Sequence, residues 1–380
     1  MYIAVDAMGG DYAPRAVVEG ALQAAQEHGI AVLLVGDRET ILRELHNAGG
    51  EESSLVAIRH ATEKIEMGDS PITALRHKPD SSLQVAFEQV KAGEAGAVVS
   101  AGNTGAVLAL AVTVLGNLAG VDRPAIVTAI PALEGGRTYL LDSGANVECK
   151  PFHLVQFAVM GEVYARLMRG VPSPRVGVLS NGEEDSKGTD TTRAAHEILK
   201  KTSLNFIGYV EGRDLNNGKV DVVVTDGFTG NVALKTMEGF WEFLQEQLRG
   251  LFTANWRNKL AFVLLRRSLA TLRTTLDPFE IGGAPLLGTD GIAIIAHGAS
   301  TPKAIKNAIR VADEALRQDI NHQILESLRA LPEISLPELK RGRKFWSQLR
   351  ERFLHTRDTH DLQPPGSPGS PGSVEEEKKE

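Results

Sequence analysis

The sequence predicts an α/β protein with a Rossmann-like, mostly parallel sheet and helices on both faces. Short β-rich runs alternate with amphipathic helical stretches over the first 330 residues, a pattern typical of parallel sheets. Most of these runs end in a Gly-rich turn, and the chain holds 38 glycines among 380 residues. Apolar residues make up 42% and charged residues 23%, which is enough to form a large core.

The expected elements follow one another from the amino terminus. Strands are expected over residues 3–5, 31–35, 97–99, 125–130, 138–141, 176–179, 220–224 and 292–295. Helices are expected over 14–28, after 105 to about 116, over 190–201, after 231, and over 302–328. Ligands of parallel sheets bind beyond the carboxyl ends of the strands. The Gly-rich turns therefore predict one sheet edge at which several loops meet around a ligand.

Composition divides the chain into a body and an appendix. Residues 1–330 form the predicted catalytic body, from which residues 240–276 protrude as a basic, amphipathic helical hairpin. Residues 331–360 are expected to form a basic helical extension. Pro, Gly and Ser dominate residues 361–380, and this composition predicts a disordered tail.

Charge and cysteine content exclude several classes of protein. The formal net charge is −7, so no basic excess points to nucleic acid. Cys149 is the only cysteine, so neither an internal disulfide nor a cysteine-based metal site can form. No signal peptide is recognised, and the apolar run 260–265 is far shorter than a membrane span. These features predict a cytoplasmic protein.

Two strand–loop–helix turns predict an anion site. Residues 100–105 and 226–231 combine glycines with hydroxyl and amide side chains where a helix is about to begin. A helix amino terminus presents unpaired N–H groups and a partial positive charge, so such loops can cradle a phosphate. Neither loop matches the Walker or the dinucleotide-binding glycine pattern, which disfavours a nucleotide enzyme. The alternative for each single loop is a tight turn that only needs glycine.

Other polar residues occupy comparable positions. Lys187 follows three adjacent carboxylates, and it either neutralises a phosphate, protonates a leaving group or belongs to a solvated charged loop. Asp142 directly follows an apolar strand, as a site carboxylate or a turn cap. His297 can bind a phosphate or act as a structural donor. Three carboxylates on one loop make a poor metal site, and Lys150 beside Cys149 is expected to lower the thiol pKa slightly.

Seven motifs occur in order over about residues 1–315. They are DAMGGD (6–11), SAGNTG (100–105), DSGAN (142–146), GEEDSKG (182–188), VEGRD (210–214), DGFTGN (226–231) and GGAPLLG (282–288). Together they resemble the bacterial phosphate acyltransferases, the PlsX family. The resemblance implies transfer of a long acyl chain from acyl carrier protein to inorganic phosphate, giving an acyl phosphate for phospholipid synthesis. It also implies a homodimer whose fold is related to phosphate acetyltransferases and isopropylmalate dehydrogenases.

The loops and the resemblance together define the candidate site. We assign catalytic roles to Lys187, Asn103, Asp142 and Asn231. Substrate binding is assigned to Gly9, Gly10, Asp11, Gly102, Thr104, Gly105, Asn146, Asp226, Thr229, Gly230, His297 and Ser300. The reaction needs positioning and oxyanion donors rather than a strong general acid, because a thiolate leaves readily. No metal and no cofactor are expected.

Expected partners follow from charge and apolar content. Residues 250–276 combine five basic residues with many apolar ones and contain no carboxylate. Such a segment can lie on an anionic membrane, contact acyl carrier protein or pack against a partner subunit. The basic stretch 340–357 is either a second lipid contact or a solvated face. Coupling to a membrane glycerol-3-phosphate acyltransferase, at the inner face of the plasma membrane, is a further expectation.

Two other functions remain open at this point. The first is a phosphate acetyltransferase-like enzyme that takes its acyl group from acyl-CoA. The second is a non-catalytic regulator that binds acyl carrier protein or phosphate. Donor preference separates the first from the expected enzyme, and absence of turnover separates the second.

Overall fold

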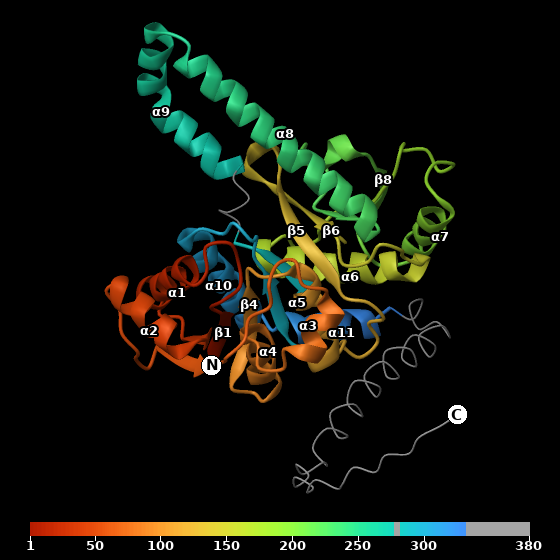
Figure 1. The fold of residues 1–380 in the computed structure, drawn as a ribbon. Helices are drawn as coiled ribbons and strands as arrows, with labels where there is room; N and C mark the ends of the chain where they lie inside the picture. Colours follow the sequence, from red (N-terminus) through yellow and green to blue (C-terminus); the bar gives the residue numbers. More distant parts are fainter. Residues whose placement is uncertain (277–281, 332–380) are drawn as a thin grey trace, which may run out of the picture. The chain divides into compact units, whose positions relative to one another are not determined.

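A single mixed β-sheet carries the described part of the chain, residues 1–276 and 282–331 (Figure 1). In this computed structural model the strand order is β3-β2-β1-β4-β11-β10-β5-β6-β9-β7-β8. The strands are β1 (Tyr2–Asp6), β2 (Val32–Gly36), β3 (Val56–His60), β4 (Ala95–Ser100), β5 (Ala125–Pro131), β6 (Arg137–Leu141), β7 (Val176–Leu179), β8 (Phe206–Val210), β9 (Val222–Val224), β10 (Ala284–Leu287) and β11 (Ile292–Ile295). The expected extension and tail, residues 332–380, lie outside the described residues.

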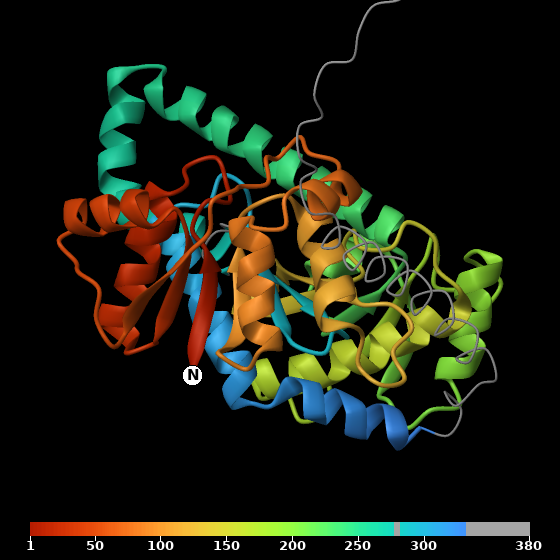
Figure 2. The same cartoon turned by 60° about the horizontal axis from the view of Figure 1, so that its bottom comes forward.

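Helices cover both faces of the sheet, as expected (Figure 2). They are α1 (Arg15–His28), α2 (Arg38–Asn47), α3 (Pro71–His77), α4 (Ser82–Lys91), α5 (Thr104–Leu110), α6 (Pro151–Arg169), α7 (Asp190–Leu199), α8 (Gly227–Thr253), α9 (Trp256–Leu276), α10 (Pro302–Arg317) and α11 (Ile320–Arg329). Shorter helical turns are η1 (Ala111–Leu115), η2 (Leu133–Gly135) and η3 (Gly212–Leu215). The predicted α/β class is confirmed.

The two halves of the sheet run in opposite directions. Strands β1 to β4 and β11 are mutually parallel, and so are β6, β9, β7 and β8. Between these halves, three successive pairings are antiparallel: β11 with β10, β10 with β5, and β5 with β6. Because three is an odd number, the strands of the second half run in the direction opposite to those of the first half. The expectation that all Gly-rich turns follow strands of one direction, at one edge of the sheet, is therefore wrong: the carboxyl ends of the two halves point in opposite directions.

Side-chain alternation along β5 decides which helices share a face. Ile126 packs with α4 and α5, whereas Ile130, on the same side of the strand, packs with Ala233 and Met237 of α8. Val127, on the other side, packs with α6. The helices α4, α5 and α8 therefore cover one face, and α1, α6 and α10 cover the other.

Some elements differ from the sequence pattern. The pattern predicts neither β3, β8 and β10 nor the helices α2, α3, α4 and α6. The strands β3 and β8 are half exposed, so they lack the continuous apolar run that marks the central strands. The predicted helix 302–328 is two helices, α10 and α11. They are separated because Asp319 adopts a left-handed conformation, with a φ of 49°.

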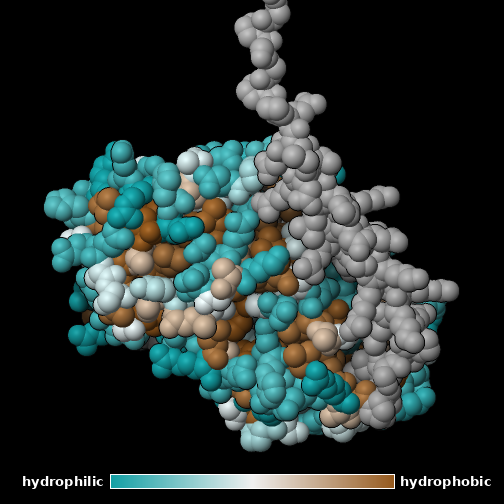
Figure 3. Space-filling view, turned by 90° about the horizontal axis from the view of Figure 1, so that it is seen from below, coloured by the Kyte–Doolittle hydropathy of each residue, from teal (hydrophilic) through white to brown (hydrophobic). Residues whose placement is uncertain are grey.

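The helices α8 and α9 form the protruding pair that the sequence predicts (Figure 1). No side chain of α8 beyond Gly230 is buried. Exposed large apolar side chains on the pair are Phe228, Val232, Phe240, Phe243, Leu251, Trp256, Leu260, Phe262, Val263, Leu264 and Leu265. On the face in Figure 3, by contrast, hydrophobic residues are broken up by hydrophilic ones. No described helix has both the length and the hydropathy that crossing a bilayer requires.

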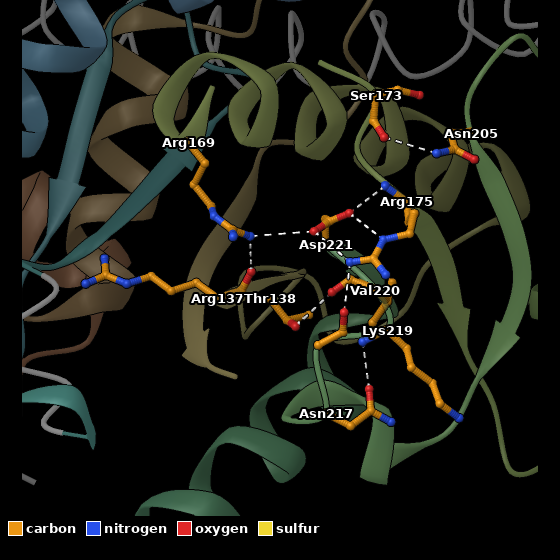
Figure 4. A network of polar contacts seen from close by, with 11 residues as sticks. Arg137, Thr138, Arg169, Ser173, Arg175, Asn205, Asn217, Lys219, Val220 and Asp221 are labelled. Atoms are coloured by element: carbon orange, nitrogen blue, oxygen red, sulfur yellow. Dashed lines mark hydrogen bonds and ion pairs between the residues drawn. The ribbon is translucent and has the colours of Figure 1, made fainter. Parts of the chain in front are cut away.

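A polar network joins the amino ends of β6, β7 and β9 (Figure 4). Asp221 precedes β9, and its carboxylate accepts hydrogen bonds from the backbone N–H and the Nε of Arg175, both at 2.9 Å. Arg169 Nη1 lies 3.6 Å from the same carboxylate and also donates to the carbonyl of Arg137. Burial raises the pKa of Asp221, but the hydrogen bonds from Arg175 and the positive charges of Arg175 and Arg169 together outweigh burial and hold the pKa below its usual value.

We expect Asp221→Asn to lower the free energy of unfolding at pH 7 by about 2 kcal/mol, since it weakens charged hydrogen bonds. A depressed folded-state pKa gives stability that is present above the unfolded value, about 3.9, and is lost as pH falls through the folded value. The difference between wild type and variant should therefore shrink below about pH 4. Urea unfolding from pH 2 to 7 measures it. Asp190→Asn, on an exposed pair, is the control. A difference that stays constant with pH would contradict the assignment.

Candidate functional site

The loop after β6 is built around the buried carboxylate of Asp142. Its Oδ1 accepts hydrogen bonds from the backbone N–H groups of Ile126, Gly144 and Ala145, at 3.0, 3.1 and 3.0 Å. Its Oδ2 accepts from the backbone N–H and the Nδ2 of Asn146, at 2.7 and 2.8 Å. Burial raises the pKa of Asp142, and these donors oppose that rise. With five protein donors on its two oxygens, Asp142 holds the loop in shape rather than meeting a substrate.

The start of α8 packs directly onto this loop. Asp226 caps the helix, because its two oxygens accept the N–H and the hydroxyl of Thr229, both at 2.8 Å. A Cβ on Gly230 would overlap the carbonyl oxygen of Asp142, so no residue other than glycine fits there. Asn231 is exposed beside the same loop, and its amide group makes no hydrogen bond to any described residue, so it can meet a ligand.

The loop after β7 carries Lys187 and shares an edge with the two loops above, because β6, β9 and β7 are neighbouring parallel strands. Asn181 Oδ1 closes this loop by accepting the N–H of Gly188 at 3.0 Å. Asp185 lies 3.2 Å from Lys200. Lys187 is half-buried and forms no ion pair with any described residue, so its ammonium group is available for an anion.

In the first half of the sheet, a second buried carboxylate holds the loops after β1 and β4. Asp6 accepts the hydroxyls of Ser82 and Ser100, at 2.6 and 2.7 Å, and burial raises its pKa. A Cβ on Gly9 would overlap Asp6 and lie 2.9 Å from the amide nitrogen of Gly102. Sequence reasoning missed the role of both serines. Ser100 stood in a motif, whereas nothing around Ser82 marks it.

The loop after β11 joins the same cluster. Asp11 donates its N–H to the carbonyl of Gly298 at 2.8 Å, and Gly10 has a φ of 111° where it passes that carbonyl. His297 Nδ1 accepts the N–H of the second residue along, at 3.2 Å, so this histidine shapes its own turn. Ser300 is buried at the start of α10. The predicted residues of these three loops are therefore brought together.

Asn103 acts within the protein as a helix cap. Its Oδ1 accepts the N–H of Ala106 at 3.0 Å, and its Nδ2 donates to the carbonyl of Met67 at 2.8 Å. Both functions of the amide are used, so Asn103 positions the amino end of α5. Thr104, the first residue of the helix, is exposed and can face a ligand. Gly105 is needed because a Cβ there would press on Pro71.

The two clusters begin at nearly the same level of the sheet, although their strands point in opposite directions. The pairings through β11 and β10 put Val98 of β4 and Ile126 of β5 in one row. β4 ends two residues beyond this row, at Ser100. On the same side of this row, β6, which runs in the opposite direction, ends one residue away, at Leu141, which pairs with Val127. The carboxyl ends of the two halves are therefore level with each other.

The helices α5 and α8 start from this level on the same face of the sheet. α8 follows β9, whose last residue, Val224, pairs with Leu141. From there α8 runs toward the amino end of β9, while α5 and η1 run the other way, to Leu115 beside Gly291 before β11. The two helix amino ends thus start at one level of the same face, with the four strands β11, β10, β5 and β6 between the strands that precede them. Each amino end carries a partial positive charge, so each favours an anion.

Cys149 is no nucleophile in this arrangement. Burial, followed by the charges of Asp142 and Asp226, raises the pKa of its thiol to about 12. The pKa of the thiol is raised rather than lowered, because burial dominates. Among the described residues no group of three or more His, Cys, Asp or Glu side chains is arranged to hold a metal ion.

Solved structures share this fold. A phosphotransacetylase from Streptococcus pyogenes superposes with a TM-score of 0.58 at 16% identity, over 83% of this chain and 94% of that one. A branched-chain phosphotransacylase from Enterococcus faecalis gives 0.50 at 16% identity, over 85% and 99%. At this identity the likeness concerns the fold alone. It confirms the expected relationship to phosphate acetyltransferases.

Sequence relatives are far closer. A phosphate acyltransferase from Geobacter sulfurreducens is 52% identical over 330 residues, 86% of this chain and 94% of the relative. One from Pelotomaculum thermopropionicum is 51% identical over 332 residues, 87% and 94% of the two chains. The family model described as "Fatty acid synthesis protein" matches residues 1–323. The chain therefore belongs to the phosphate acyltransferase family, and it is an acyltransferase.

Proposed function

We propose that the enzyme transfers a long-chain acyl group from the thioester of acyl carrier protein to inorganic phosphate, for phospholipid synthesis. The observation that carries this proposal is that two capped helices, α5 and α8, begin at one level of the same sheet face, each from a set of glycine-packed loops. Such an arrangement favours a multiply charged oxyanion. The family name supports phosphate as acceptor, while acyl carrier protein as donor rests on the sequence resemblance.

The reaction needs little acid–base chemistry from the protein. A phosphate oxygen attacks the thioester carbonyl carbon, the C–O bond forms and the C–S bond breaks. The thiolate leaves readily because a free thiol has a pKa of ~8.5. It ends as the thiol, and the proton that it takes up is balanced by the one that the hydrogen phosphate gives up. Holding both reactants in contact removes much of the entropic cost. Hydrogen-bond donors at the developing oxyanion supply the rest of the transition-state stabilisation.

We divide the roles between residues whose polar groups have no partner among the described residues and residues whose polar groups are hydrogen-bonded within the protein. Lys187 and Asn231 have free groups, so we assign them to phosphate and oxyanion contact. Asp142 and Asn103 are occupied by protein partners, so we assign them to positioning of their loops.

The second candidate is an acyl-CoA-dependent phosphotransacylase. The shared fold of the solved phosphotransacetylases favours it. The non-catalytic regulator loses its basis, since the chain belongs to a family of acyltransferases.

Phosphate-dependent release of free carrier from palmitoyl-acyl carrier protein tests the proposed function, with acyl phosphate trapped by hydroxylamine. We expect turnover with this donor to exceed that with palmitoyl-CoA and acetyl-CoA by at least about tenfold in kcat/KM, a difference of ~1.4 kcal/mol in transition-state binding. Omission of phosphate is the control. Faster turnover of either coenzyme A ester would favour the second candidate instead.

We expect Lys187→Met and Asn231→Ala each to reduce kcat/KM at least about tenfold, because each removes a donor for a charged oxygen. Both residues are at least partly exposed, so folding should be unaffected. Lys201→Met removes an exposed lysine after α7 and serves as the matched control. Initial rates at varied phosphate measure the effect. Near-wild-type activity in both variants would remove these assignments.

We propose further that the enzyme is a cytoplasmic homodimer, that α9 rests on the anionic inner face of the membrane, and that this brings the product close to a membrane glycerol-3-phosphate acyltransferase. Leu264 is 76% exposed and Val263 57%, between the basic residues Lys259 and Arg266. Exposed apolar and basic side chains on one helix are what interfacial binding requires. Carrier docking and subunit packing are the competing uses of the same surface.

Leu264→Glu is expected to lower partition into anionic vesicles about tenfold, because burial of one leucine contributes roughly 1.5–3 kcal/mol. Leu42→Glu, on exposed α2, should bind as wild type does. Vesicle co-sedimentation measures partition, and light scattering of the same samples measures mass. A variant that becomes monomeric would assign α9 to the subunit interface, contrary to this proposal.

A further inference from the structure

A small cavity of about 170 Å³ lies on the face of the sheet opposite to α5 and α8. Strands β5, β6 and β10 form its floor, and α6 and α10 form its walls. Its lining includes Tyr139, Tyr164, Met168, Arg137, Arg310 and Glu314. Met168 packs against the cores of both halves, so the cavity marks the place where these two cores meet. It is separate from the candidate active site because the sheet lies between them.

Two buried tyrosines supply polar atoms that the protein itself does not use. Tyr139 and Tyr164 are each 5% exposed, and their rings meet edge to face with centroids 5.0 Å apart. Neither hydroxyl has a hydrogen-bond partner among the residues that the structure describes. Neither hydroxyl is among the fully buried atoms that lack a partner, and both tyrosines line the cavity, so both hydroxyls are open to a bound group that accepts two hydrogen bonds.

The charges around the cavity select the sign of that group. Arg137 makes no ion pair with its guanidinium within the described ranges, and Arg310 has one partner, Glu314, at 3.5 Å. The pair of Arg310 and Glu314 is partly exposed and therefore weak. A guanidinium has five N–H donors, so Arg310 can keep Glu314 and still bind an anion. Two arginines against one glutamate leave a net positive charge.

The tyrosine hydroxyls lie within the field of these charged groups. Burial raises the pKa of Tyr139 and of Tyr164, which keeps both hydroxyls protonated as donors. The positive charge of Arg137 lowers the pKa of both tyrosines, and that of Arg310 lowers the pKa of Tyr164. The guanidinium groups are therefore close to the phenols. Two guanidinium groups and two phenol O–H donors thus line the same cavity.

From this convergence we infer that the cavity is a binding site for a small oxyanion of phosphate size, distinct from the acyl-transfer site. Arginine pairs bind phosphate and carboxylate oxygens in a bidentate manner, and phenols complete the set of donors. The volume admits a group of a few heavy atoms, whereas a nucleotide or an acyl chain would need several times more space.

Equilibrium dialysis of the full chain with radiolabelled inorganic phosphate tests this inference. Wild type should bind one phosphate per chain in the cavity, in addition to any at the candidate active site. The double variant Tyr164→Phe with Arg310→Met should lose one phosphate per chain, and Lys187→Met should keep the cavity phosphate. Arg317→Gln is the matched control, since this arginine lies on α10 and pairs with Asp313 outside the cavity.

The outcomes separate this site from the proposed function. If the double variant binds as many phosphates as wild type and Arg317→Gln, the inference is overturned. If wild type binds one phosphate and the double variant none, the cavity site stands while phosphate binding at the acyl-transfer site fails. Circular dichroism monitors folding of the double variant. Should it unfold, Tyr139→Phe takes its place, with binding weaker by about tenfold expected and unchanged binding overturning the inference.

Discussion

Two buried carboxylates are the interactions on which the rest of the site depends. Asp6 and Asp142 each stand where a central strand ends. Asp6 gathers donors that are 76 and 94 residues away in the sequence, whereas Asp142 is held by its own loop and by Ile126 of β5. A buried carboxylate is costly unless its oxygens are paired, so the surrounding chain must supply N–H and O–H groups at fixed places. The loops are therefore rigid before any substrate arrives, which is what electrostatic stabilisation of a transition state requires.

Opposed strand directions place these two centres on one face. Three antiparallel pairings reverse the second half of the sheet, and the register brings the carboxyl ends of both halves to the same level. α5 and α8 then point their amino ends toward the middle while running apart. A sheet with all strands parallel would have set these helices side by side, with their positive ends on one edge.

Sequence patterns predicted the class of fold, the central strands and the loops that form both clusters. Each signal was local: an apolar run followed by glycine. The direction of β6 relative to β4 depends on β10, a strand of four residues, and on pairings between residues more than 150 positions apart, so no local pattern contains it. The role of Ser82 escaped for the same reason, because its partner Asp6 is 76 residues away. Conversely, Asn103 and Asp142 were correctly placed in the loops, but only geometry reveals that their polar atoms are already used.

The length of α8 has a mechanical consequence. With 27 residues at ~1.5 Å each, this helix is a rod of about 40 Å. Near its start Gly230 packs directly against Asp142 and is followed by Asn231, and farther along the helix Phe240 and Phe243 are exposed. Because Gly230 has no side chain, the backbone of α8 contacts the backbone of Asp142 directly, and the helix can pivot about this contact. A molecule that binds the distal end of α8 would therefore act, through this rod, on the position of the Asn231 amide.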